Sequence, residues 1–133
     1  MAKRFNVTGT CFPHRHYMAD ISAKLKIAMG MINYGDYFAI NRPRQYGKTT
    51  TLQTITNYYK KSNSYLVFRI SFEGTGDNMF KEEKAFSQGF LRVLSNYADY
   101  ALPKLTKWLK ETSTQVEDLD SLSKSLVRKL FLP

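Results

Sequence analysis

The residues best suited to chemistry are Gly47, Lys48, Thr49 and Thr50, which stand consecutively in the chain. A glycine lets the backbone approach a phosphate group without a side chain in the way. A lysine ammonium can reach the β- and γ-phosphates of a nucleotide, and a threonine hydroxyl beside it can ligate Mg²⁺. This order of residues is typical of the second half of a phosphate-binding loop. It predicts binding of ATP together with Mg²⁺.

The first half of the loop departs from the usual pattern. In G-x-x-x-x-G-K-[ST] the leading glycine would fall at Arg42, so the strict motif is not met. Pro43 also lacks the N–H group that an ordinary residue would offer to a phosphate. The later donors, from Tyr46 to Thr50, remain available, and we expect them to carry the binding.

The elements around the loop should position it. The apolar run 36–41 predicts a buried strand before the loop, and the spacing of apolar residues over 49–61 predicts a helix after it. The β-branched and aromatic run 64–72 predicts a second strand. A helix over 20–33, with Asp20 as its N-cap, comes first. This order predicts an α/β fold, a βαβ unit with parallel strands and a right-handed connection.

The rest of the chain reads as helical. We expect a helix over 79–101, a short helix carrying Leu105, Trp108 and Leu109 after Pro103, and a last helix over 117–131.

The predicted organisation is a single partial P-loop NTPase domain over 1–133. It comprises an N-terminal segment 1–19, a nucleotide-binding part 20–73 and a helical part 79–133. Parallel sheets normally contain more than two strands, and the chain stops on an apolar stretch at Pro133. We therefore expect the sequence to be the N-terminal part of a longer protein.

The run Arg42-Pro43-Arg44-Gln45-Tyr46-Gly47-Lys48-Thr49, preceded by Tyr17-Met18-Ala19-Asp20, resembles the AAA-ATPase-like P-loop family. Members of that family often carry an R-P-R-x-x-G-K-[ST] loop after a tyrosine–valine–aspartate segment, so the missing leading glycine is a habit of the family. The resemblance covers roughly residues 14–73. Ala19 stands where the family tends to have valine.

The resemblance implies that Lys48 binds the β- and γ-phosphates, that Thr49 holds Mg²⁺ through the nucleotide, and that Gly47 and Thr50 contribute backbone amides. Arg42 and Arg44 either touch phosphate or an acidic neighbour, or are solvated loop residues. The complete predicted nucleotide site consists of Arg44, Gln45, Tyr46, Gly47, Lys48, Thr49 and Thr50.

Hydrolysis would need a further carboxylate at the end of a buried strand to hold Mg²⁺. No apolar run ending in paired acidic residues lies downstream of residue 73. Glu73 follows a predicted strand but comes soon after Lys48, and Asp118 and Asp120 fall at a predicted helix start, where charge stabilisation explains them. No catalytic residue is identified. We expect an ATPase-like chain that binds nucleotide and shows little turnover by itself.

An alternative function comes from the charge. Twenty basic residues against eleven acidic ones give a net charge of +9, which suits an anionic partner. The charge is spread thinly, and the row Lys104, Lys107 and Lys110 would share a helix face. The alternative is thus a basic helical module that binds nucleic acid, or a protein-interaction surface over 79–133 with Trp108 as an anchor. No cluster of aromatic residues among lysines and arginines stands out, so we expect the aromatic residues to fill the core.

The remaining signals are weak. Cys11 is the only cysteine, and no apolar run approaches the length of about 20 residues that spans a bilayer. We expect a cytoplasmic protein without a membrane partner, and the sequence allows an oligomer. Cys11, His14, His16 and Asp20 are too few and too poorly spaced to predict a metal site.

Overall fold

The computed structural model describes most of the chain, namely residues 2–5, 12, 14–17, 21–41, 47–98 and 102–131. The chain divides into two compact units, Met1–Val67 and Phe68–Pro133. We describe each unit by itself. The first contains the predicted phosphate-binding residues, and the second contains most of the apolar core.

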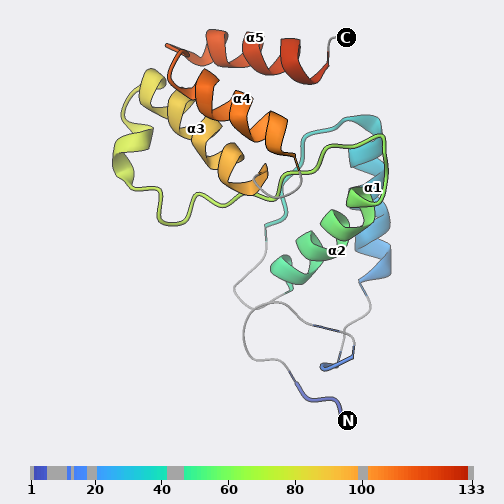
Figure 1. Cartoon of the computed structure of the whole chain (residues 1–133). Coiled ribbons are helices and arrows are strands. Elements are labelled where there is room, and N and C mark those ends of the chain that lie inside the picture. Colours follow the sequence, from blue (N-terminus) through green and yellow to red (C-terminus); the bar gives the residue numbers. More distant parts are fainter. Residues whose placement is uncertain are drawn as a thin grey trace. The chain divides into compact units, whose positions relative to one another are not determined.

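Helices account for the regular structure of the described residues (Figure 1). They are α1 (Ser22–Tyr34), α2 (Lys48–Lys60), a short 3₁₀ helix η1 (Asp77–Phe80), α3 (Glu83–Ala98), α4 (Pro103–Ser113) and α5 (Leu119–Leu130). The structure confirms the helices that the apolar spacing predicts, with ends shifted by a few residues. The predicted helix 79–101 is divided into η1 and α3.

The prediction of an α/β fold with a βαβ unit is wrong. Neither 36–41 nor 64–72 forms a strand, and the described residues contain no sheet. The one β-bridge among them is parallel and joins Arg4 to His16. A parallel strand is stable when neighbouring strands and helices cover it on both faces. Here Tyr37 is fully exposed and Leu66 is about half exposed, so neither segment has the surroundings that a parallel strand requires.

The core of the second unit lies between α3, α4 and α5, which run alongside one another in Figure 1. Its buried members are Leu91, Leu94, Ala98, Leu109, Val116 and Leu122. Phe68 and Ile70, from the irregular segment before η1, pack against this core. These two residues of the predicted strand 64–72 therefore cover helices instead of forming part of a sheet.

Buried hydroxyl groups line the helices of the second unit. Ser87 and Ser95 are buried on α3, and Thr106 and Ser113 are buried on α4. Each hydroxyl donates to a carbonyl one turn back, in its own helix or, for Thr106, at the N-cap Leu102; Ser87 Oγ, for example, donates to Glu83 O at 2.8 Å. Because the hydroxyls are satisfied locally, they can be buried without unpaired donors.

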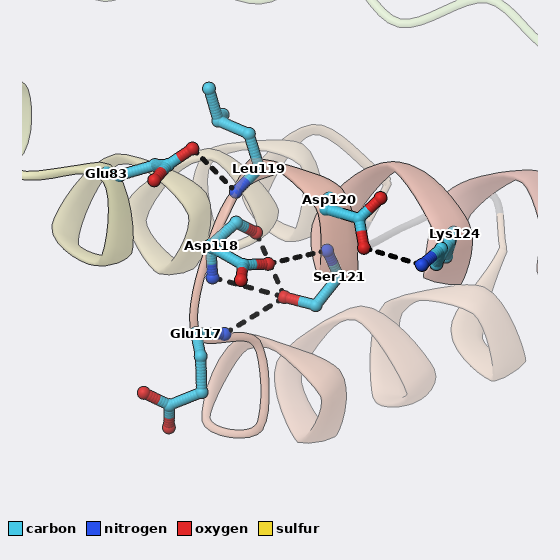
Figure 2. A network of polar contacts seen from close by, with 7 residues as sticks. All are labelled: Glu83, Glu117, Asp118, Leu119, Asp120, Ser121 and Lys124. Carbon is cyan, nitrogen blue, oxygen red and sulfur yellow. Dashed lines mark hydrogen bonds and ion pairs between the residues drawn. The ribbon is translucent and has the colours of Figure 1, made fainter.

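A capping box starts helix α5 (Figure 2). The Ser121 N–H donates to Asp118 Oδ1 at 2.7 Å, and the Asp118 N–H donates in return to Ser121 Oγ at 3.1 Å. The Leu119 N–H donates to Glu83 Oε1 at 3.4 Å, which ties this helix start to the start of α3. The structure confirms that Asp118 serves a helix N-terminus.

The first unit has a much thinner core. Among its described residues, Ala28 and Tyr59 are the buried hydrophobic ones. The Tyr59 hydroxyl lies 3.2 Å from Met29 O and 2.9 Å from Asn33 Oδ1. Polar contacts at one buried aromatic residue thus connect α1 to α2. Fewer buried apolar residues stabilise this unit than stabilise the second.

Leu109 tests the core of the second unit, because its side chain is only 1% exposed. We expect Leu109→Ala to lower the free energy of unfolding by about 2–5 kcal/mol, since it leaves a cavity among α3, α4 and α5. Lys107→Ala, on the exposed side of the same helix, should change it by less than about 0.5 kcal/mol. The single tryptophan, Trp108, reports the transition in a urea titration. Equal effects of both substitutions would contradict this packing.

Asp118 makes the stability of the second unit depend on pH. The Ser121 N–H and hydroxyl lower the pKa of the Asp118 carboxyl below its ordinary value. A carboxyl whose pKa is lowered by folding stabilises the protein above its unfolded pKa and loses that effect as pH falls through the folded pKa. The melting temperature of the wild type, relative to Asp118→Asn, should therefore fall as the pH drops below about 4. A difference between the two proteins that is independent of pH would contradict the role of the charged cap.

Candidate phosphate-binding site at the start of helix α2

Helix α2 begins directly after Gly47, whose φ of 78° and ψ of 17° lie in the left-handed region. This conformation is costly for residues with a Cβ atom and easy for glycine. A Cβ built on Gly47 would meet no atom within 4 Å. The glycine is therefore required by the backbone conformation and not by lack of space. It turns the chain sharply into the helix at the point where the sequence predicts a phosphate.

The first turn of α2 offers backbone donors. The Thr51 N–H donates to Gly47 O at 2.9 Å, which closes the first helical hydrogen bond. The N–H groups of Lys48 and Thr49 come before this bond and have no acceptor inside the helix. No described side chain caps α2, and no acidic residue lies in its first turn. Such a helix start attracts an anion through its N–H groups and the helix dipole.

The side chains of the first turn differ in their exposure to solvent. Thr50 and Thr51 are buried, whereas Thr49 is exposed and Lys48 is half buried. The Thr51 hydroxyl donates to Gly47 O at 2.8 Å and thereby braces the turn. Thr49 is thus the threonine whose hydroxyl is accessible to a metal ion carried by a nucleotide.

The structure brings Gly47, Lys48, Thr49 and Thr50 together on one helical turn, as the sequence predicts. The other members of the predicted site, Arg44, Gln45 and Tyr46, lie outside the described residues, as do Arg42 and Pro43. The predicted strand before the loop is not formed. Among the described residues, Gly47 and α2 set the geometry of this turn, and no sheet edge adjoins it.

Two of the three acidic residues considered for catalysis have local partners for their carboxylates. Asp118 caps α5, and Asp120 forms an ion pair with Lys124 at 2.6 Å. Glu73 lies in a turn after the irregular segment, where its N–H donates to Ser71 Oγ at 3.2 Å. Asp118 and Asp120 thus have structural roles, and we assign none of the three residues a catalytic role.

The net charge is distributed very unevenly between the two units. Met1–Val67 contains ten lysine and arginine residues against two acidic ones, a net charge of +8. Phe68–Pro133 contains ten against nine, a net charge of +1. The first unit, which contains Gly47 and α2, therefore has the strongly positive electrostatic field. The sequence alone gives the total of +9 but not the boundary that separates these two sums.

The histidines do not form a metal site with described neighbours. The Phe12 N–H donates to His16 Nδ1 at 3.0 Å, so a ring nitrogen of this buried histidine is already used. Burial of the ring and the charges of Arg15, Arg4 and His14 lower the pKa of His16. No group of metal-ligating residues occurs in the described part of the chain, and Cys11 and Asp20 lie outside it.

Sequence reasoning missed a second grouping, at the far end of α2. Tyr58, Tyr59 and Tyr65 are neighbours there, with ring centroids 5.1 Å apart for the first pair and 4.6 Å apart for Tyr59 and Tyr65. Lys60 and Lys61 follow immediately in the chain. The only signal in the sequence is the run Tyr58-Tyr59-Lys60-Lys61, because Tyr65 reaches the group through the fold.

Two glycines of the first unit should respond in opposite ways to alanine. Gly47→Ala should destabilise the unit by about 1–2 kcal/mol, because alanine resists a positive φ. Gly30→Ala, in the interior of α1 with no atom within 4 Å of the added Cβ, should stabilise it by about 0.5–1 kcal/mol. Amide hydrogen exchange in α1 and α2 measures both changes. Stabilisation by Gly47→Ala would rule out the left-handed turn.

Comparison with protein-family models, with curated proteins and with solved structures found no match. The resemblance to AAA-ATPase-like proteins therefore stays an expectation from the loop residues alone. Among the described residues, no helix is both long enough and apolar enough to cross a membrane. The geometry of α2 and the distribution of charge are the features that bear on function.

Proposed function

We propose that the chain binds a nucleoside triphosphate, ATP with Mg²⁺, at the start of α2. The observation that carries the proposal is Gly47 in the left-handed conformation, followed by Lys48 and Thr49 in the first turn of a helix that no described side chain caps. A triphosphate supplies the negative charge that this helix start lacks.

Each residue has a distinct role in the proposed complex. The N–H groups of Lys48 and Thr49 donate to phosphate oxygens, and the Lys48 ammonium neutralises the β- and γ-phosphates. The exposed Thr49 hydroxyl provides one oxygen ligand for Mg²⁺. Mg²⁺ prefers oxygen ligands and usually keeps several waters and phosphate oxygens, so one hydroxyl from the protein is a sufficient contribution.

The proposal does not need a sheet. Support comes from the helix start and from the net charge of +8 in Met1–Val67, which favours any phosphate ligand. It is restricted to binding, because the carboxylates Asp118 and Asp120 are engaged in the structure of α5. We derive no hydrolytic step.

The alternative function on the second unit has less support. Lys107 faces Glu111 at 3.9 Å, and the unit as a whole carries a net charge of only +1. Trp108 packs partly against the core, with Lys129 Nζ 5.6 Å from its ring centroid. Both features reduce the value of this face as a nucleic-acid surface or a protein anchor.

The proposal predicts that Lys48→Ala weakens ATP binding by about tenfold or more, because it removes a charge-assisted contact to phosphate. Isothermal titration of the whole chain with ATP, with and without Mg²⁺, measures the effect. Lys60→Ala at the other end of α2 is the matched control and should bind like the wild type. Thr49→Ala should weaken binding only when Mg²⁺ is present.

Two results would count against the proposal. One is the absence of ATP binding by the wild type. The other is equal affinity in the wild type and Lys48→Ala, which would place the nucleotide elsewhere.

A further inference from the structure

Exposed aromatic side chains and lysines lie at the end of the first unit that is opposite to Gly47. Tyr34 is 89% exposed, Tyr58 is 59% exposed and Tyr65 is 40% exposed. Lys60 and Lys61 are exposed as well. We call these five residues the tyrosine–lysine surface. They come from the last turn of α1, the last turn of α2 and the segment that follows.

Hydrogen bonds and ring contacts hold part of this surface in place. Asn33 Oδ1 accepts from the Tyr59 hydroxyl at 2.9 Å and from the Tyr65 hydroxyl at 3.1 Å. Tyr59 is buried, and its ring contacts the rings of Tyr58 and Tyr65. Tyr34 directly follows Asn33 in the chain. The rings of Tyr58 and Tyr65 are therefore held by contacts with Tyr59 and Asn33, so little of their side-chain freedom remains to be lost on binding.

The charge around the surface selects an anionic occupant. The first unit contains only two acidic residues, Asp20 and Asp36, against ten basic ones. Ile27, which is 62% exposed, lies about two helical turns before Tyr34 on the same side of α1. A ligand that covers this surface thus meets apolar rings and positive charge at the same time.

Single-stranded nucleic acid has the matching chemistry. Its bases present flat faces that stack on aromatic side chains, and its backbone carries one negative charge per nucleotide. In duplex DNA the base faces are stacked inside, so exposed tyrosine rings could not reach them. A protein partner would need a complementary acidic face, whereas a nucleic-acid strand supplies regular charge by its backbone.

We propose that the tyrosine–lysine surface binds single-stranded nucleic acid, with bases on Tyr34 and Tyr58 and phosphates near Lys60 and Lys61. The inference does not depend on ATP binding. Helix α2 has 13 residues and therefore places its two ends about 20 Å apart, which separates this surface from Gly47.

A fluorescein-labelled single-stranded oligothymidine of about 20 nucleotides tests the proposal, with fluorescence anisotropy of the whole chain as the readout. Replacing both rings by Tyr34→Ala with Tyr58→Ala should weaken binding by at least about tenfold. The double change to phenylalanine keeps the rings and should retain most of the affinity. Tyr97→Ala, at a tyrosine of α3 that is 53% exposed, is the matched control in the other unit.

A salt titration separates the two lysine groups. For a single strand, each lost phosphate contact lowers the slope of log affinity against log salt by about 0.7. Lys60→Gln with Lys61→Gln should therefore reduce the slope by about 1.4. Lys104→Gln with Lys107→Gln, in α4, should leave it unchanged. If the slope fell only in the Lys104→Gln with Lys107→Gln variant, the nucleic acid would bind to the second unit, which would overturn the proposal.

Three further results would overturn it. The first is no binding of the oligonucleotide at low salt. The second is equal binding of the single strand and of a duplex of the same length. The third is full affinity in the double alanine variant when circular dichroism shows its helices intact. A clear preference for the single strand, lost with the two rings and kept with phenylalanine, supports it.

Discussion

The hydrogen bonds of the Tyr59 hydroxyl decide the arrangement of the first unit. This hydroxyl contacts Met29 O and Asn33 Oδ1, and Tyr59 is the large buried side chain that joins α1 to α2 in the described part of the chain. Burial, followed by the effects of Tyr65 and Tyr58, raises the pKa of Tyr59. The phenol therefore stays protonated and can donate. Together with the Tyr65 hydroxyl, which donates to the same Asn33 Oδ1, this junction links the C-terminal end of α2 to α1.

The two units divide stability and surface chemistry between them. The second unit has a continuous core of leucine, alanine and valine side chains and satisfies its buried hydroxyls within its helices. The first has few buried apolar residues, exposes many aromatic ones and carries nearly all of the net charge. Regions with few buried contacts open more readily, and binding segments are often drawn from them. A bound anion would neutralise part of the charge that the first unit concentrates.

The helical part of the structure was predictable because local rules govern it. The spacing of Leu105 and Leu109 and the position of Asp118 before the last helix gave the helices of the second unit, and the structure confirms them. Gly47-Lys48-Thr49 correctly indicated the start of a helix. These signals involve residues within one or two helical turns of each other, so they can be recognised from a short stretch of sequence.

The errors come from interactions between distant residues. The preference of Val67, Phe68 and Ile70 for strands measures how well such residues fit a covered sheet, and Phe68 and Ile70 instead cover a helical core. The tyrosine–lysine surface was missed because Tyr65 meets Asn33 across 32 residues of chain. The prediction that aromatic residues mainly fill the core also fails at Tyr34 and Tyr58, which are exposed.

The central claim is that a nucleotide binds at the start of α2, and a ¹H–¹⁵N amide spectrum of the whole chain titrated with Mg²⁺–ATP tests it most directly. The claim predicts that the amide resonances of Gly47, Lys48, Thr49 and Thr50 show the largest chemical-shift changes. The amide resonances of α3, α4 and α5 should keep their chemical shifts. Shifts centred on the second unit, or an unchanged spectrum at millimolar ATP, would contradict it.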